Sequence, residues 1–131
     1  MSNAAFKRNF AKVLQSVGEK ADLVVRKTAL ELQSSMIRMS PVGVGTFRGN
    51  WQAGIGSINT TTTDAANSDA LGRSTTVLQG WKAGQTIYLT NSMPYARRLE
   101  FGWSKQAPAG MVRLSVQNLE AYMKKAAESI K

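Results

Sequence analysis

A helical repeat of apolar residues over residues 5–39 is the strongest constraint on how this chain can fold. Apolar or small side chains recur every three or four residues, which places them on one face of an α-helix. They are Phe6, Phe10, Val13, Val17, Ala21, Val24, Thr28 and Leu32. Gly18 interrupts the pattern and predicts a bend. Pro41 ends it, because the residue before a proline avoids helical backbone. The sequence therefore predicts one long N-terminal helix.

The second half of this helix carries another apolar stripe. Leu23, Leu30 and Ile37 recur every seven residues and lie roughly 150° around the helix from the first stripe. One core cannot cover two opposite faces of a helix. Either a sheet covers one face and a second helix covers the other, or these three residues form an interface with a neighbouring subunit.

Two strands and a C-terminal helix follow from the remaining apolar patterns. Alternating residues predict strands at about residues 51–60 and 86–91. In residues 111–130 apolar side chains recur every three or four positions, opposite a face of mixed charge. This pattern predicts an amphipathic helix that packs on a sheet rather than on a membrane.

A polar stretch lies between the two predicted strands. Its Thr, Ser, Asn and Asp residues are typical of an exposed excursion, so we expect a polar insert or mobile loop at about residues 60–80. A short helical turn is compatible with residues 70–81. Pro94 and Gly102 bound a second short helix, over residues 94–101. Long helices packed on a small antiparallel sheet define an α+β fold, and 131 residues correspond to one domain.

Composition argues against several functions. The chain has no cysteine and no histidine, which excludes thiol and histidine catalysis and the usual zinc ligands. Its eight acids show no paired spacing of the kind that acid–base catalysis or metal binding needs. We therefore expect no enzymatic activity, metal or cofactor. No apolar run is long enough for a membrane span, and no signal peptide is recognisable, so we expect synthesis in the cytoplasm.

The net charge of +9 makes nucleic-acid binding an alternative function. The excess is spread along the chain, with +4 in residues 1–40, +3 in residues 41–110 and +2 in residues 111–131. A dedicated DNA-binding protein usually concentrates its charge on one helix or face. This distribution favours a diffuse positive field that tolerates DNA nearby.

Two short stretches are the most specific features of the sequence. Residues 91–103 combine three aromatic residues, two arginines and a glutamate with a proline and a glycine. Residues 41–50 are glycine-rich and predict a loop, but they lack the Gly-Lys-Ser/Thr of a phosphate-binding loop. The stretches read Pro41-Val42-x-x-Gly45-x-Phe47-Arg48-x-Asn50 and Asn91-x-x-x-Tyr95-Ala96-x-x-x-Glu100-x-Gly102.

This pair of motifs resembles the neck or tail-completion (head–tail joining) proteins of long-tailed bacteriophages. The family pattern is Pro-Val-Asp-Thr-Gly-x-Leu-Arg-x-Ser, followed later by Tyr-Ala-x-x-x-Glu-x-Gly-Thr. The matching residues are Pro41, Val42, Gly45, Arg48, Tyr95, Ala96, Glu100 and Gly102. The chain departs from the pattern at Gly43 and Val44 in place of Asp-Thr, and at Phe47, Asn50 and Trp103 in place of Leu, Ser and Thr.

The resemblance implies a small, non-enzymatic virion subunit. Such proteins form rings, commonly of six subunits, that complete the tail and join it to the capsid connector. The implied partners are further copies of this chain in a hexameric ring, the tail tube and terminator proteins, and the head connector proteins. DNA would pass nonspecifically through the lumen, and no membrane is involved. The implied location is the neck or tail of the virion, after synthesis in the host cytoplasm. A tail terminator or another neck ring protein is the alternative.

The charged motif residues predict structural contacts. Glu100 either forms a surface salt bridge with Arg97, three residues earlier, or accepts a bidentate bond from Arg48 that holds the two motifs together. Arg97 and Arg98 are adjacent on the predicted helix, so at most one of them pairs with Glu100. The other is available for the DNA backbone or for a neighbouring subunit.

The remaining motif residues predict packing and backbone roles. We expect Tyr95 to pack on the sheet rather than to contact a ligand. Gly45 and Gly102 are expected to satisfy backbone requirements such as a positive φ.

Overall fold

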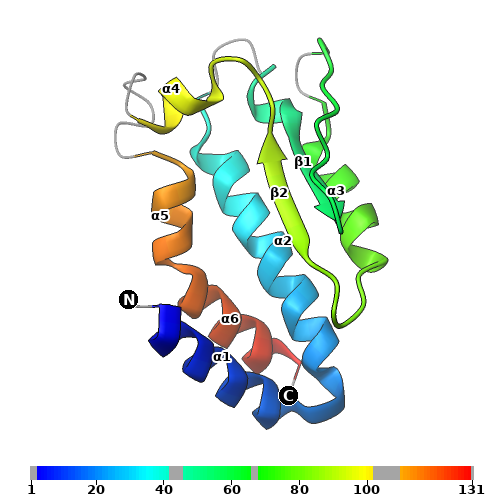
Figure 1. Ribbon diagram of the computed structural model, residues 1–131, viewed down its shortest axis with the longest axis vertical. Coiled ribbons are helices and arrows are strands. Elements are labelled where there is room, and N and C mark those ends of the chain that lie inside the picture. The colour runs from blue at the N-terminus through cyan, green and yellow to red at the C-terminus, as the bar shows by residue number, and fades with distance from the viewer. Residues whose placement is uncertain (1–2, 42–45, 66–67, 102–109, 131) are drawn as a thin grey trace.

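The chain folds as an α+β protein in which helices pack against a small two-stranded antiparallel sheet (Figure 1). The computed structural model describes residues 3–41, 46–65, 68–101 and 110–130. In chain order the elements are α1 (Asn3–Val17), η1 (Gly18–Lys20), α2 (Ala21–Met39), η2 (Arg48–Asn50), β1 (Trp51–Ile55), α3 (Ala70–Gln79), β2 (Ile87–Asn91), α4 (Ala96–Glu100), α5 (Val112–Gln117) and α6 (Leu119–Ser129). The predicted fold class is confirmed. No helix among the described residues is long and apolar enough to cross a membrane.

The N-terminal helical segment changes direction at Gly18. This residue has a φ of +56°, a left-handed conformation that glycine adopts readily, and it opens the 3-10 turn η1. Before the turn, α1 packs against α6, and after it α2 runs up the centre of the molecule (Figure 1). The predicted bend is confirmed, and it divides the apolar repeat between two helices.

Helix α2 contributes to two hydrophobic clusters. Near its N-terminus, Val24 packs against α6, with Phe10 of α1 at the edge of the cluster. Near its C-terminus, Met36 packs with Trp51 of β1 and with Met111. Elements of the same chain thus cover α2 at both of its ends, with a helix near the N-terminus and a strand near the C-terminus.

The second apolar stripe of α2 is divided between core and surface. Ile37 packs against the cluster around Met36, within its own subunit. Leu30 is half-buried and Leu23 is 37% exposed, and both border a small cavity beside α3. A subunit interface on this stripe stays a prediction, with Leu23 its most accessible member.

Strands β1 and β2 pair antiparallel, with Trp51 opposite Asn91 and Ile55 opposite Ile87. β1 is almost fully buried, because α3 packs against it, whereas every residue of β2 is half-buried. β1 is shorter than the predicted strand at residues 51–60. The chain turns back after Ile55 and passes so close to Gly54 that no side chain fits there.

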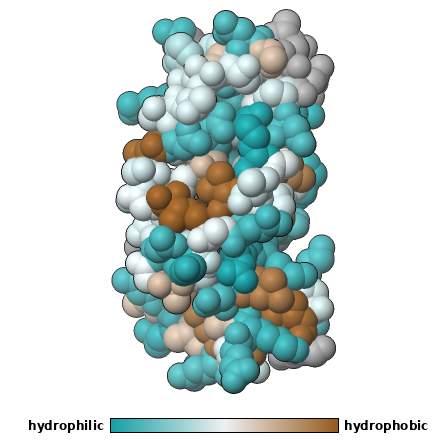
Figure 2. Space-filling view, turned by 90° about the vertical axis from the view of Figure 1, so that its right-hand side faces the viewer, coloured by the Kyte–Doolittle hydropathy of each residue, from teal (hydrophilic) through white to brown (hydrophobic). Residues whose placement is uncertain are grey.

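Residues 57–65 form the exposed part of the polar stretch. They have no regular secondary structure and lie along β1, where Gln52 donates to the Thr61 carbonyl and Asn50 accepts the Thr63 N–H. On this side the surface is mostly hydrophilic and carries separate apolar patches (Figure 2). The predicted polar excursion is therefore confirmed here.

The next part of the polar stretch is a helix, α3. Asp69 caps it, since its Oδ1 accepts the Gly72 N–H at 2.9 Å. Leu78 and Ser74 are buried against the rest of the molecule, and Ser74 accepts a bond from Gln33 of α2 at 3.0 Å. The short helix is confirmed, and a mobile loop is wrong for residues 70–79, because the helix buries one face.

The predicted C-terminal helix is interrupted at Asn118. Its Nδ2 donates to the Leu114 carbonyl at 3.1 Å, a local bond that competes with helical backbone, and α5 and α6 diverge at this point (Figure 1). α6 buries Met123, as its pattern predicts. In α5, however, Val112 and Val116 are 38% and 43% exposed. The apolar face of α5 therefore borders an open groove.

Candidate functional site

Glu100, the last residue of α4, caps the N-terminus of α5. Its Oε1 accepts the N–H groups of Met111 and Val112 at 2.7 and 2.8 Å. Its Oε2 accepts the Arg113 N–H at 3.0 Å and pairs with the Arg113 Nε at 3.0 Å. The Arg113 Nη2 also donates to the Glu100 carbonyl. First-turn N–H groups lack partners within a helix and carry a positive partial charge, so a carboxylate stabilises them.

These contacts keep the Glu100 carboxylate ionised. Burial would by itself raise the pKa of Glu100, but the hydrogen bonds from Val112, Arg113 and Met111 favour the charged form and lower the pKa below its ordinary 4.5. Both carboxylate oxygens are occupied, and a lowered pKa makes a weaker base. The geometry suits a structural role better than proton transfer.

Gly110 is part of the same arrangement. Its φ is +90°, in the left-handed region that favours glycine. A Cβ there would lie 2.6 Å from the Glu100 Oε2 and 3.0 Å from the Arg113 Nη2. Only glycine leaves room for the carboxylate to reach the first turn of α5.

Arg48, in η2, binds the opposite kind of helix end. Its Nη2 donates to the carbonyls of Arg38 and Ser40 at 2.9 and 2.7 Å, at the C-terminus of α2. The last carbonyls of a helix lack partners and carry a negative partial charge. Arg48 therefore stabilises the end of α2 as Glu100 stabilises the start of α5.

The predicted bond between Arg48 and Glu100 is wrong, because each side chain is taken by a helix terminus of opposite partial charge. The alternative pair between Arg97 and Glu100 is absent from the ion pairs of the described residues, and Arg113 occupies that position. Sequence spacing favoured Arg97, but α5 folds back over the end of α4 and brings Arg113 to the carboxylate.

The two motifs nevertheless meet, through Phe47. The Asn91 Nδ2 donates to the Phe47 carbonyl at 2.9 Å. The buried Phe47 ring lies 5.8 Å from the Tyr95 ring and 6.1 Å from the Trp51 ring, measured between centroids. Tyr95 thus packs on an aromatic side chain beside the sheet, and the motifs are joined by aromatic packing and an amide rather than by a salt bridge.

Ser40 links the helix end to the core. Its buried hydroxyl donates to the Met36 carbonyl at 2.7 Å and accepts the Trp51 indole N–H at 2.8 Å. A buried indole N–H needs such a partner. Pro41 follows directly and is half-buried. The sequence marked Pro41, whereas the structure makes Ser40 the contact between motif and core.

The motif arginines lie on the surface of α4. Arg97 places its guanidinium 5.9 Å from the centroid of the Phe101 ring, and Arg113 lies over the same ring at 4.9 Å. Phe101 is 58% exposed, and Arg98 is exposed as well. Cationic groups over an accessible ring are available to a partner surface. Gly45 and Gly102 lie outside the described residues, so their predicted backbone roles stay predictions.

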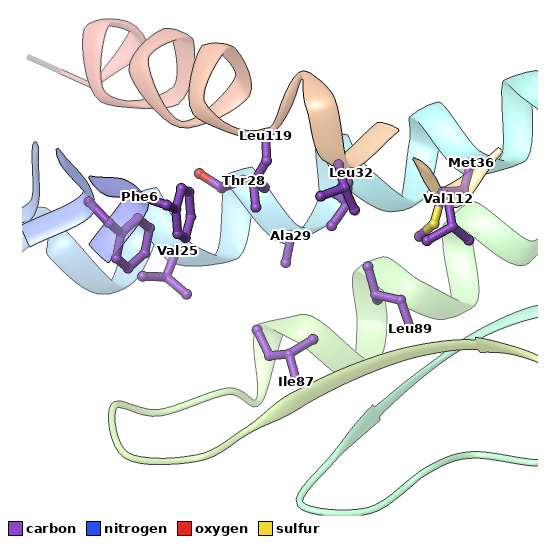
Figure 3. A pocket seen from close by; sticks show the side chains of 12 residues that line it. Phe6, Val25, Thr28, Ala29, Leu32, Met36, Ile87, Leu89, Val112 and Leu119 are labelled. Carbon is purple, nitrogen blue, oxygen red and sulfur yellow. The ribbon is translucent and has the colours of Figure 1, made fainter. Parts of the chain in front are cut away.

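A long apolar groove runs beside β2, with a volume of about 340 Å³. Figure 3 shows its walls, with Leu32 and Met36 of α2 facing Ile87 and Leu89 of β2. Phe6, Phe10, Val25, Thr28, Ala29, Val112, Val116 and Leu119 complete the lining. A second hollow, near Glu100 and Arg97, shares Leu89 and Val112 with it. The two hollows therefore adjoin at Leu89 and Val112, and the second one reaches the motif residues.

Sequence reasoning missed Gly110, Arg113 and the groove. The Glu100 cap joins residues 11 to 13 positions apart across an intervening segment, whereas a recognisable capping pattern spans about three residues. Apolar spacing identified some of the groove residues, such as Phe6 and Leu32, but assigned them to the core, and it did not identify Val25, Ala29 or Met36.

Comparisons of this chain with protein-family models, curated proteins and solved structures gave no match. The fold is a helix-rich α+β arrangement in which Glu100 and Arg48 each bind a helix terminus.

Proposed function

We propose that this chain is a non-enzymatic structural subunit of a tailed-bacteriophage virion. It forms a ring at the head–tail junction, completes the tail and joins it to the capsid connector. The proposal begins from the paired motifs at residues 41–50 and 91–102, which resemble those of neck and tail-completion proteins.

The observation that carries the proposal is the way in which the motif charges are used. The side chains of Glu100 and Arg48 both form hydrogen bonds to helix termini of their own subunit. Residues that bind the ends of two segments position those segments and do not act on a substrate. Both capped ends lie at the same end of the molecule, near α4 (Figure 1). Such an end is suited to contact with another protein.

The proposed partners are further copies of this chain in a hexameric ring, the tail tube and terminator proteins, and the head connector. DNA contacts would be nonspecific, because the charge of +9 is spread along the chain. The protein would be made in the host cytoplasm and reside in the neck of the virion.

Complementation in vitro tests the proposal. A lysate of the encoding phage that lacks this gene supplies heads and tails, and the purified chain is added. We expect infectious particles to form and negative-stain images to show rings at the tail end that meets the connector. Gold-labelled protein distinguishes this position from a terminator bound before the head joins. No gain of infectivity and no binding to tails or connectors would refute the proposal.

A further inference from the structure

The two edges of the β-sheet differ. Beyond β1, side chains cover the edge, since Asn59 donates to the Ala53 carbonyl at 3.3 Å and Arg73 donates to the Trp51 carbonyl at 3.3 Å. Proteins commonly protect strand edges in this way from pairing with another chain. The edge of β2 has no such cover within the described residues.

The register identifies the backbone groups on the β2 edge. The Gly56 N–H donates to the Thr86 carbonyl, so the hydrogen-bonded pairs of the ladder continue at Tyr88 and Thr90. The N–H and carbonyl groups of Ile87, Leu89 and Asn91 therefore point away from β1. No backbone bond within the described chain involves these groups. An extended segment can pair with them while its side chains enter the adjoining apolar groove.

The segment 57–63 on the far side of β1 has the complementary features. Its backbone is held on that side by the Thr61 carbonyl, which accepts a bond from Gln52, and by the Thr63 N–H, which donates to Asn50. Ile58, Thr60 and Thr62 are exposed, and Ile58, at 55%, is the large apolar side chain among them. Threonine and isoleucine favour strands.

The groove and the exposed segment also differ in charge. Helix α1, which lines one end of the groove with Phe6, carries Lys7, Arg8 and Lys12 and no acid. Residues 57–69 carry Asp64 and Asp69 and no base, in a chain with 17 basic and 8 acidic residues. A basic groove end and an acidic continuation of the exposed segment are complementary.

From these observations we propose that a second copy of this chain docks its segment 57–63 along the β2 edge. Ile58 of one copy enters the groove of the next beside Leu89 and Val112. The segment runs antiparallel to β2, which brings Asp64 to the basic turn of α1 at Lys7. The two surfaces differ, so every copy offers one of each and association is head-to-tail, which gives a ring when the rotation between copies closes. This docking inference rests on the proposed function in one respect, because both require copies of the chain to contact one another.

Cross-linking tests the contact. Because the chain has no cysteine, an introduced cysteine is the only thiol that can react. Ile58→Cys protein and Val112→Cys protein are mixed and treated with a short bismaleimide. We expect covalent dimers in the mixture and none in either protein alone. A protein carrying both substitutions is expected to give a ladder of oligomers. Dimers in Ile58→Cys protein alone would indicate a two-fold contact and overturn the proposal.

Leu23→Cys is the matched control, because Leu23 is the exposed member of the α2 stripe. Mixed with Val112→Cys protein it is expected to stay monomeric. Cross-linking through Leu23 without cross-linking through Ile58 would move the interface to α2 and overturn the proposal.

Charge reversal supplies a second measurement. Asp64→Lys is expected to weaken self-association about two- to fivefold in sedimentation. Adding Lys7→Glu should restore it. No loss, or no restoration, would contradict the contact between Asp64 and α1.

The outcomes separate this inference from the proposed function. Oligomers and complementation without the Ile58–Val112 cross-link would refute the interface and leave the function standing. The cross-link without complementation would refute the neck role and leave the interface standing. No cross-link and no self-association, in solution or on tails, would overturn the docking proposal itself.

Discussion

At the scale of single residues, the motif charges act on helix termini. Glu100 and Arg48 are each bound to backbone groups of opposite partial charge. The sequence identified both as structural residues, but not their partners. A glutamate and an arginine suggest a salt bridge, whereas the folded chain supplies each of them with closer backbone groups.

Glu100→Gln should lower the free energy of unfolding at pH 7 by about 1–3 kcal/mol, because three N–H groups and Arg113 lose a charged acceptor. Urea denaturation measures it. Glu31→Gln is the control, since Glu31 forms only a surface pair with Arg38 at 3.5 Å, and it should cost less than about 0.5 kcal/mol. Equal losses would contradict the cap.

Acid should remove the contribution that the Glu100 carboxylate makes to the free energy of unfolding. The pKa of Glu100 is lowered in the folded state from its ordinary 4.5. The folded chain therefore takes up the proton less readily than the unfolded chain, and stability falls as protons bind. The contribution of Glu100 is complete above pH 4.5 and is lost as the pH falls through the folded-state pKa. The stability difference between wild type and Glu100→Gln should shrink over that range, and a constant difference would contradict the assignment.

Gly110→Ala should destabilise the protein more than Gly84→Ala. Both glycines have a positive φ, +90° and +94°, so each alanine costs about 1–2 kcal/mol in backbone strain. Only at Gly110 would the Cβ also approach Glu100, while nothing lies within 4 Å at Gly84. Thermal or urea unfolding of the two variants isolates the steric part. Equal losses would show that the chain near Gly110 relaxes.

At the scale of elements, the apolar repeats predicted which segments are helical, and side-chain chemistry decided where those helices stop. The left-handed Gly18 separates α1 from α2, and the Asn118 side chain ends α5. The polar stretch indicated α3 only as a compatible short turn, because a ten-residue helix with one buried face needs few large apolar residues. Local composition predicted the exposure of the polar stretch correctly only for residues 57–65.

Arg48→Ala should loosen the C-terminal turn of α2. The carbonyls of Arg38 and Ser40 would lose their donor. Amide hydrogen exchange should quicken in the last turn of α2 and stay unchanged near Val24. Arg26→Ala, which removes a bond to the Trp81 carbonyl, is a control of similar size. Uniformly faster exchange along α2 would indicate general destabilisation and contradict a local role.

At the scale of the whole molecule, the charge and the groove are the features open to partners. The charge of +9 predicts weak binding to duplex DNA that is independent of sequence and falls steeply between about 50 and 200 mM salt. Fluorescence anisotropy with two unrelated duplexes measures it. A preference for one duplex, or binding that persists at high salt, would favour a dedicated nucleic-acid-binding function.

The sequence by itself determined the α+β class, the N- and C-terminal helical segments and the pair of strands, because apolar periodicity and glycine or proline placement are local properties. The tertiary structure decided the rest. Glu100 pairs with Arg113 rather than Arg48, Val112 and Val116 border a groove, and the β2 edge has no cover among the described residues. Each of these outcomes depends on how segments that are distant in the sequence pack together. The local spacing of residues does not predict that packing.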